Sequence, residues 1–315
     1  MNKKIHTAIL ITGVSGFIGR VLARYFHKRQ YRVYGIDRAM PDQAPLSDLY
    51  HYEQVNLPSS LLPQFLADWR VDAVIHCAGR ASVPAAMQDP YADYVDGPIL
   101  TFELLEALRK NLPECAFLLL SSAAVYGNPQ YLPIAEDAPI KPISTYGYHK
   151  WQSETICAEF SSVYGLKTAC ARIFSAYGPG LRRQVVWDII NKVLTQPVIE
   201  LQGNGRESRD FIHVNDIASG LDVILHQSPL NGDTYNLASG IGTSIESLTS
   251  KIVNKMNYGG SIKYSDVLPP GTPRNWVADI RRISSLGYMP MIGLDEGLSS
   301  YIIWAVENSS RKTLF

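Results

Sequence analysis

The chain has 315 residues, of which 46% are hydrophobic, and it carries 29 Lys and Arg residues against 29 Asp and Glu residues. A chain of this length can bury a large core, and it fits one large domain or two closely packed domains rather than a string of small modules. Because the formal net charge is zero, no overall field attracts nucleic acid or an acidic membrane, and we expect neither as a partner. No apolar segment reaches the ~20 residues that a membrane-spanning helix needs.

The four cysteines form no CxxC pair, and three of them fall in apolar strand or helix patterns, where a small buried thiol packs well. We therefore expect reduced packing residues and a cytoplasmic protein. His76-Cys77 has no second pair of ligands to complete a metal site, so we predict no bound metal. The cysteines are Cys77, Cys115, Cys157 and Cys170.

The first predicted unit is a strand, a glycine-rich turn and a helix. The apolar run at residues 8–11 predicts a buried parallel strand, and an amphipathic helix follows the turn to about residue 28. The first glycine permits a tight turn, the second lets backbone amides approach a pyrophosphate at the helix N-terminus, and the third allows the helix to pack close to the sheet. The residues of this predicted dinucleotide site are Gly13, Gly16, Phe17, Ile18 and Gly19.

An acidic residue ends the second predicted strand, at residues 32–36. Asp37 lies about 20 residues beyond the glycine-rich turn, where an acidic residue accepts hydrogen bonds from an adenosine ribose. A carboxylate there repels a 2′-phosphate, which favours NAD over NADP as the cofactor. The neighbouring Arg38 leaves room for dual use, and a capping or turn role for Asp37 is the alternative.

Strands and helices continue to alternate as far as residue 173, which predicts an α/β protein with a doubly wound, Rossmann-like parallel sheet. Beyond residue 175 the alternation loosens into short strands and helices. We therefore predict a dinucleotide-binding domain at residues 1–174 and a smaller, mainly substrate-binding lobe at residues 175–315, which can return elements to the first domain. The remaining predicted helices cover residues 61–69, 92–110, 146–164, 185–195 and 298–307, and the remaining strands cover residues 72–76, 116–121, 167–173 and 198–201.

Three polar residues point to proton transfer. The strand at residues 116–121 runs into Ser122, which places a hydroxyl at its carboxyl end, where open α/β sheets build their sites. Tyr146 and Lys150 are four residues apart on the next predicted helix, so their side chains share a face. A phenol titrates near ~10 in water, and a nearby ammonium stabilises its phenolate. Taken alone, the pair favours a tyrosine ring packed under a lysine stem, but the preceding strand and serine favour a proton shuttle for a sugar hydroxyl.

Several stretches of the chain match the motifs of one known family. They are TGVSGFIG at residues 12–19, HCAG at 76–79, SSAAVYG at 121–127, Tyr146 with Lys150, YGP at 177–179, residues 203–216 and YNLAS at 235–239. Across nearly its whole length the chain resembles the extended short-chain dehydrogenase/reductase family, in its nucleotide-sugar epimerase and dehydratase branch.

The resemblance assigns roles to these residues. It implies that Tyr146 is the acid and base, that Lys150 holds the nicotinamide ribose of NAD, and that both Tyr146 and Ser122 contact the sugar. The other cofactor contacts that it implies are Asn56 and Leu57 at the adenine, together with Cys77, Ala78 and Gly79. Helices at residues 92–110 and 146–164 match those of a four-helix dimer seam, which implies a homodimer. The second helix carries Ile156, Phe160 and Val163 on one side.

The substrate that the resemblance implies is a nucleotide-diphosphate sugar. Arg209 matches an arginine that binds the diphosphate, for which the planar guanidinium is well suited. A second family arginine falls on Pro269, and Arg274 or Arg206 is the predicted substitute. A surface arginine beside a turn is the alternative for Arg206. Ser175 replaces the usual Asn before the YGP motif and stays a predicted substrate contact.

Two alanines narrow the reaction. Sugar 4,6-dehydratases of this family usually carry an Asp-Glu pair where this chain has Ala123-Ala124, and elimination of water needs such an acid and base. What remains is hydride transfer at a sugar carbon. Asp37 and Ser122 fit retention of NAD through the reaction, so the sequence predicts an NAD-dependent epimerase that acts at C4 of the sugar. The alternatives are an NAD(P)H-dependent reductase of 4-keto-6-deoxy sugar nucleotides and an NAD-binding sensor or scaffold without catalysis.

Overall fold

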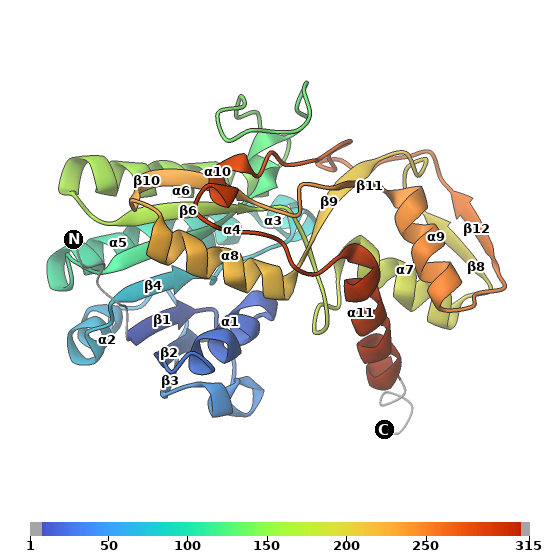
Figure 1. The fold of residues 1–315 in the computed structure, drawn as a ribbon. Coiled ribbons are helices and arrows are strands. Elements are labelled where there is room, and N and C mark those ends of the chain that lie inside the picture. Colours follow the sequence, from blue (N-terminus) through green and yellow to red (C-terminus); the bar gives the residue numbers. More distant parts are fainter. Residues whose placement is uncertain (1–7, 310–315) are drawn as a thin grey trace.

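A seven-stranded parallel sheet forms the centre of the structure, a computed structural model that describes residues 8–309 (Figure 1). The strand order is β10-β6-β5-β4-β1-β2-β3, and neighbouring strands are parallel throughout. The strands are β1 (Ala8–Thr12), β2 (Arg32–Asp37), β3 (His51–Gln54), β4 (Ala73–His76), β5 (Ala116–Ser122), β6 (Thr168–Ile173) and β10 (Asn231–Leu237).

Helices cover both faces of this sheet and form two cores with it. Ile9 and Ile11 of β1 enter the core under α1 and α8, whereas Leu10 enters the opposite core under α2, α5 and α6. Since both faces are covered, all five residues of β1 are buried, and residues 8–11 form a continuous apolar run. This arrangement confirms the predicted doubly wound fold. The helices are α1 (Phe17–His27), α2 (Leu62–Trp69), α5 (Leu100–Asn111), α6 (Thr145–Tyr164) and α8 (Val214–Gln227).

The winding direction of the sheet changes between β1 and β4. From β1 the chain continues through β2 and β3 on one side, and it then places β4, β5 and β6 on the other side. A crevice opens beyond the strand ends at such a point, and open α/β sheets bind their ligands there. The ends of β1 and β4 meet at this crevice, because the Cys77 amide donates to the Thr12 carbonyl at 3.1 Å.

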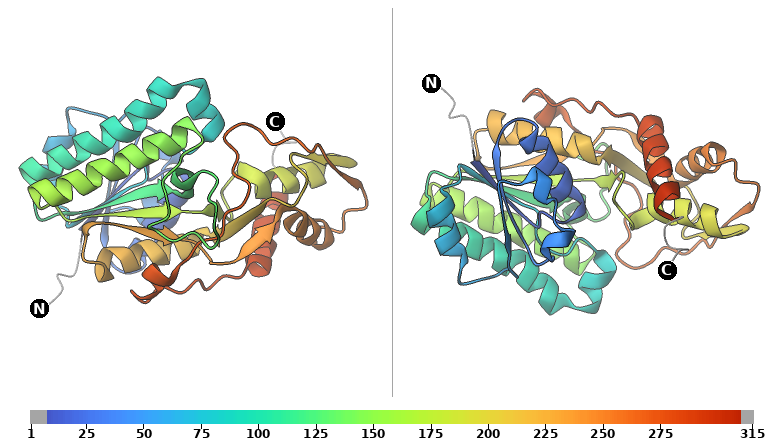
Figure 2. Two further views of the ribbon diagram at one scale, coloured as in Figure 1. Left: turned by 90° about the horizontal axis from the view of Figure 1, so that it is seen from above. Right: turned by 90° about the horizontal axis from the view of Figure 1, so that it is seen from below.

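A smaller lobe lies beside the carboxyl ends of the large sheet (Figures 1 and 2). It contains a three-stranded sheet in the order β11-β9-β7, a parallel pair of β8 and β12, and a core of its own that includes Tyr177 and Tyr301. Its elements are β7 (Ser175–Tyr177), α7 (Gln184–Thr195), β8 (Val198–Leu201), β9 (Ser208–His213), β11 (Gly242–Ser244), α9 (Ile245–Lys255), β12 (Ser261–Tyr264) and α11 (Leu294–Ser309).

Parts of the second half of the chain lie at the large sheet. β10 pairs with β6 in parallel, with Tyr235 opposite Ala171. α8 and α10 (Arg281–Ser284) pack into the same core of the large sheet as α1. The division into two domains at residue 174 stays a prediction. The two ends of the predicted domains, residues 1–7 and 310–315, lie outside the described residues.

Some elements differ from those expected. The predicted helix at residues 92–110 is divided into α4 (Pro90–Tyr94), a π-helical turn η3 (Val95–Ile99) and α5, because Pro98 has no N–H for the regular ladder. β3 and α3 (Val83–Gln88) were not expected, and β3 is a short, partly exposed edge strand. The short helical turns are η1 (Pro41–Gln43), η2 (Leu46–Asp48) and η4 (Ala123–Tyr126).

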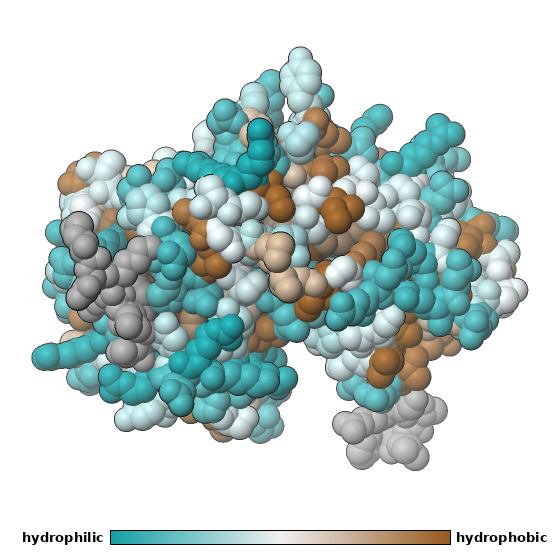
Figure 3. All heavy atoms as spheres, in the orientation of Figure 1, coloured by the Kyte–Doolittle hydropathy of each residue, from teal (hydrophilic) through white to brown (hydrophobic). Residues whose placement is uncertain are grey.

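Hydrophilic side chains cover most of the face shown in Figure 3, and a few apolar patches interrupt them. Two exposed apolar residues, Ile303 and Val306, belong to α11. Scattered apolar side chains of this kind are normal on a protein surface. Within residues 8–309, none of the helices has the length and apolar character needed to cross a membrane.

Candidate active site

The glycine-rich turn after β1 is packed too closely for side chains. Gly13 has a φ of 69°, and its amide donates to the Ile36 carbonyl of β2 at 2.8 Å. A Cβ atom on Gly13 would lie 2.7 Å from the Ala78 nitrogen, and a Cβ atom on Gly19 would collide with the Gly13 carbonyl oxygen. These two glycines therefore allow the ends of β1, β2 and β4 to meet directly in front of α1.

A cavity of about 500 Å³ opens at this turn, which is large enough for a small organic ligand. The predicted cofactor residues that line it are Gly13, Gly16, Asp37, Arg38, Asn56, Leu57, Cys77, Ala78 and Gly79. The lining residues that sequence reasoning missed are Ser15, Ile36, Ala39, Met40, Gln43, Val55, Asp96 and Leu100. Asp96 and Leu100 come from the interrupted helix, where no motif marked them.

Three further predicted cofactor residues lie behind the cavity, at the start of α1, whereas Tyr146 and Lys150, predicted to contact the cofactor as well, lie on α6 and do not line the cavity. Phe17 packs against the core of the smaller lobe, and Ile18 packs against the core that α1 and α8 form with the large sheet. Gly19 packs directly against the backbone of the glycine-rich turn. Gly16 caps α1 without any side-chain hydrogen bond, so the first amides of the helix remain available to an anion. The close-packed turn and these amides fit the pyrophosphate of a dinucleotide.

Asp37 is held rigidly at the end of β2. One carboxylate oxygen accepts a hydrogen bond from the Ser15 amide at 2.8 Å, and the other accepts one from the Ala39 amide at 3.1 Å. The Tyr52 hydroxyl donates to the Ala39 carbonyl at 2.5 Å and braces the same turn. The carboxylate therefore presents a fixed negative charge at the cavity, while Arg38 beside it is exposed.

We expect the protein to bind NAD at least about tenfold more tightly than NADP, because the fixed Asp37 carboxylate repels a 2′-phosphate and accepts hydrogen bonds from free ribose hydroxyls. Calorimetric titration with both cofactors measures the ratio. Asp37→Asn should reduce the preference, whereas Asp42→Asn, on the nearby turn η1, should leave it unchanged. Equal or tighter binding of NADP by the unmodified protein would show that Arg38 dominates the site.

Ser122 and the Lys150 ammonium both lie at the carboxyl end of β5. The Lys150 ammonium donates to the Leu120 carbonyl at 2.8 Å and lies 5.8 Å from the centre of the Tyr146 ring, within the range of a cation–π attraction. The Ser122 hydroxyl oxygen accepts a hydrogen bond from the Ala124 amide at 3.2 Å, so its own hydrogen remains free to donate to a ligand.

Tyr146 is brought to the same place because α6 begins against the turn that follows Ser122. The Ser144 hydroxyl caps the helix by accepting from the Gly147 amide at 3.2 Å. A Cβ atom on Gly147 would lie 2.6 Å from the Ala124 carbonyl oxygen, so a larger residue would push the helix away. The structure therefore gathers the three predicted catalytic residues at one end of the sheet.

Two titratable groups beneath Lys150 are held neutral. Burial, followed by the positive charge of Lys150, lowers the pKa of His76 to about 3, and its Nδ1 atom lies 2.7 Å from the Thr12 hydroxyl oxygen. Burial raises the pKa of the Cys77 thiol and outweighs the opposing effect of Lys150. At neutral pH, therefore, neither group carries a charge that would compete with the Lys150 ammonium.

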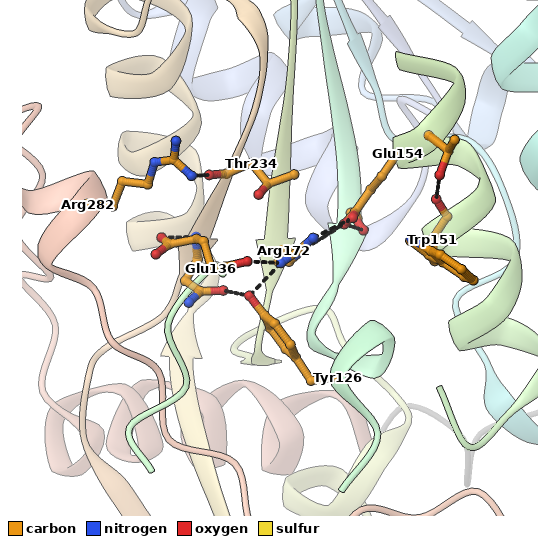
Figure 4. Close-up of polar contacts among 10 residues, drawn as sticks. Tyr126, Glu136, Trp151, Glu154, Arg172, Thr234 and Arg282 are labelled. Atoms are coloured by element: carbon orange, nitrogen blue, oxygen red, sulfur yellow. Dashed lines mark hydrogen bonds and ion pairs between the residues drawn. The ribbon is translucent and has the colours of Figure 1, made fainter. Parts of the chain in front are cut away.

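A buried ion pair joins α6 to the strands beneath it, as Figure 4 shows. Arg172 of β6 donates to both carboxylate oxygens of Glu154, with Nη2 to Oε2 at 2.8 Å and Nε to Oε1 at 3.0 Å. The Ser121 hydroxyl donates to Glu154 at 2.5 Å, and Arg172 also donates to the Tyr126 hydroxyl oxygen at 2.8 Å. The pair therefore ties α6, β5, β6 and η4 together. Sequence reasoning missed it.

Arg209 of β9 carries a partly buried positive charge in the smaller lobe. Its guanidinium donates to the Pro273 carbonyl at 2.8 Å and to the Arg274 carbonyl at 3.0 Å, and it lies 5.7 Å from the centre of the Trp276 ring. Burial lowers the pKa of Arg209 to about 10, against the opposing charge of Glu207, so the group stays charged at neutral pH. Since carbonyl oxygens do not neutralise a cation, Arg209 can attract an anionic ligand.

The other predicted substrate contacts are less enclosed. The Arg206 side chain is exposed on the turn between β8 and β9, and its amide donates to the Asn204 side chain at 3.0 Å. The Arg274 side chain is also exposed, and its backbone contacts Arg209. Ser175 begins β7 and pairs with Phe211 of β9. The structure thus brings the Arg274 backbone against the Arg209 guanidinium, while the side chains of Arg206 and Arg274 are both exposed.

Comparison with known proteins places the chain in a family. The sequence profile of the NAD dependent epimerase/dehydratase family matches residues 9–238. UDP-glucuronate 4-epimerase of Thermodesulfobacterium geofontis is 28% identical over 316 residues, which cover 95% of this chain and 96% of that protein. The structure of MoeE5 in complex with UDP-glucose and NAD has 26% identity and a TM-score of 0.86, over 98% of this chain and 100% of that one.

A second solved structure is similar over a comparable length. UDP-N-acetylglucosamine 4-epimerase from Methanobrevibacter ruminantium M1, in complex with UDP-N-acetylmuramic acid, has 25% identity and a TM-score of 0.87, over 97% of this chain and 100% of that one. The predicted family and the predicted cofactor, NAD, are thereby confirmed. The chain belongs to the NAD-dependent epimerase/dehydratase family.

Proposed function

We propose that this protein is an NAD-dependent 4-epimerase of UDP-sugars. One observation carries the proposal: Ser122, Tyr146 and Lys150 lie together at the carboxyl end of β5, next to β4, and the residues that follow β4 line the cofactor cavity. Ala123 and Ala124, which follow Ser122 in the chain, are buried alanines. The first three side chains can move a proton at a sugar hydroxyl while hydride is transferred. The two alanines offer no acid or base for eliminating water.

The relatives support the substrate class. T. geofontis UDP-glucuronate 4-epimerase and the M. ruminantium enzyme are both named as 4-epimerases, and MoeE5 is also solved with UDP-glucuronic acid and NAD. A hexose or hexuronate carried by UDP is therefore the proposed substrate, with C4 as the reacting carbon. These relatives do not favour a ketoreductase. The intact catalytic side chains argue against a sensor without catalysis.

Bound NAD supplies a hydride acceptor for the C4 hydrogen. The Tyr146 oxygen takes the proton from the C4 hydroxyl as the carbon is oxidised, and it gives the proton back when hydride returns. The Lys150 ammonium, anchored on the Leu120 carbonyl, stabilises negative charge on that oxygen and keeps two N–H groups for ribose hydroxyls. Ser122 donates its free hydrogen to the sugar oxygen and fixes its orientation.

Arg209 is the proposed ligand of the UDP diphosphate, and Arg209→Met should raise the KM for the sugar nucleotide by about 10- to 100-fold, because a hydrogen bond to a charged group is lost. Binding of NAD should change little, since Arg209 is not among the residues that line the cofactor cavity. Initial rates over a range of UDP-glucose concentrations give the KM. Lys263→Met, which removes an exposed positive charge from β12 of the same lobe, is the control. A comparable rise in both variants would assign the effect to overall charge.

A homodimer through α5 and α6 is part of the proposal. The two helices lie side by side in Figure 2, with the rings of Phe102 and Phe160 5.3 Å apart. Phe102, Trp151 and Val163 are exposed, at 45%, 41% and 65%. Of the side chains expected on this face, Phe160 is instead buried inside the subunit, and Ile156 is partly buried. The exposed apolar residues suit burial against a second copy.

The dimer is tested by light scattering during gel filtration. We expect twice the chain mass for the unmodified protein and a shift toward monomer for Trp151→Glu, because a charge would be buried at the seam. Ile303→Glu, on the exposed face of α11, is the control and should not change the mass. A monomeric unmodified protein would contradict the homodimer.

The cytoplasmic location, which rests on the cysteine pattern alone, stays a prediction.

The proposed reaction is tested with a panel of UDP-glucose, UDP-galactose, UDP-glucuronic acid and UDP-N-acetylglucosamine. The purified protein is incubated with each sugar nucleotide without added NADH, and proton NMR follows inversion at C4. We expect at least one compound to be interconverted with its C4 epimer. If none is converted, while a 4-keto-6-deoxy sugar nucleotide consumes added NADH stoichiometrically, the protein is a reductase and the proposal is wrong.

A further inference from the structure

Two segments of the smaller lobe reach the loop and helix that follow β4. The Arg183 guanidinium, at the start of α7, donates through Nη1 to the Ala81 carbonyl at 2.8 Å. On the other side, a Cβ atom on Gly271 would lie 3.0 Å from Val83 of α3 and 3.2 Å from the Ser144 side chain, which caps α6. Both contacts therefore lie at the rim between the cofactor cavity and the catalytic helix.

The backbone beside Arg183 is strained. Arg183 occupies the N-cap position of α7 without a side-chain cap, and the next residue, Gln184, has a φ of 67°, which is costly for a residue with a side chain. Strain of this kind persists where the surrounding structure holds it, and it is found at clamps and switch regions. The neighbouring Arg182 instead lies over Trp187 and Trp304, within its own lobe.

We propose that Arg183 is a positioning residue that latches the smaller lobe onto the loop after β4 and so retains the oxidised sugar until hydride returns. This inference rests on the proposed function. In that interval the C4 hydride has passed to NAD and the hydroxyl proton to Tyr146, so escape of the keto sugar would leave reduced cofactor on the enzyme and no epimer. A charge-assisted bond from Arg183 to Ala81 opposes such opening directly at the rim.

The latch is tested with Arg183→Met, which keeps an apolar stem and removes the donors, and with Arg182→Met as the matched control. Each variant, loaded with NAD, is incubated with UDP-glucose and with UDP-glucuronic acid. The reduced cofactor that accumulates per epimerisation turnover is followed by absorbance. We expect about a tenfold increase for Arg183→Met, no increase for Arg182→Met, and a KM within about threefold of the original value. An unchanged ratio would overturn the proposal, and so would a large rise in KM without accumulation, which would make Arg183 a substrate ligand.

Hydrogen exchange provides a readout that does not depend on turnover. In the NAD-bound protein, amides at residues 81–87 should exchange about tenfold faster in Arg183→Met than in the unmodified protein or in Arg182→Met. Equal exchange in all three proteins would show that no latch exists. Faster exchange in Arg183→Met, together with no conversion of any UDP-sugar by the unmodified protein, would contradict the proposed function. It would still show that Arg183 holds the two lobes together.

Discussion

Tyr146→Phe should lower kcat for C4 epimerisation at least ~100-fold, the low end of what one acid-base group contributes. The substitution removes the oxygen that exchanges a proton with the sugar hydroxyl, while the ring that packs near Lys150 remains. Lys150→Ala should have a loss of similar size, because the charge next to that oxygen is removed. Both rates are measured by proton NMR with the sugar nucleotide that the unmodified protein converts.

Tyr148→Phe is the matched control for Tyr146→Phe. Tyr148 lies on the same helix and is 48% exposed, so loss of its hydroxyl should leave both kcat and stability unchanged. Near-normal turnover by Tyr146→Phe would require another proton shuttle, for which Tyr148 and His149 are the next candidates. His149 is the less suitable of the two, because its Nδ1 atom is already paired with Asp93 at 2.6 Å.

Arg172→Met should lower the free energy of unfolding by about 3–5 kcal/mol, because it leaves the Glu154 carboxylate buried without its cationic partner. The two side chains are 6% and 5% exposed, so water cannot replace the lost bonds. Urea denaturation measures the change, with the midpoint and slope compared between variants. The double variant Glu154→Leu with Arg172→Met removes both charges and should recover much of the loss.

A surface pair provides the control for this loss. Lys167 and Glu114 form an ion pair whose side chains are 45% and 78% exposed, and Lys167→Met should cost at most about 1 kcal/mol. If Arg172→Met cost no more than Lys167→Met, the buried pair would not stabilise the junction of α6 with β5 and β6, contrary to its geometry.

The sequence predicts the large sheet well, because the information for it is local. β1 and β5 contain continuous apolar runs, at residues 8–11 and 116–120, since both faces of a parallel sheet are covered, and such runs are visible without knowing the partner strands. The position of the proposed catalytic residues follows from the same logic. Ser122 ends an apolar strand, and parallel strands place their carboxyl ends at one edge of the sheet.

Other features depend on contacts between distant parts of the chain. Glu154 and Arg172 each look like a surface charge in sequence, and the fold alone makes them a buried pair. Asp96 lines the cofactor cavity from the π-helical turn η3, and no sequence motif indicates that geometry. β3 was missed because a short, partly exposed edge strand lacks the apolar run that marks β1.

In the proposed reaction, hydride leaves C4 and returns to the same carbon within one bound state. This is tested by incubating the purified protein, without added cofactor, with UDP-glucose or UDP-glucuronic acid deuterated at C4. Proton NMR and mass spectrometry then report where the label lies in the C4 epimer. We predict that the epimer retains the deuterium at C4, because the nicotinamide carries it and Tyr146 exchanges only the hydroxyl proton. Epimerisation with loss of the deuterium to solvent would contradict hydride transfer to and from C4.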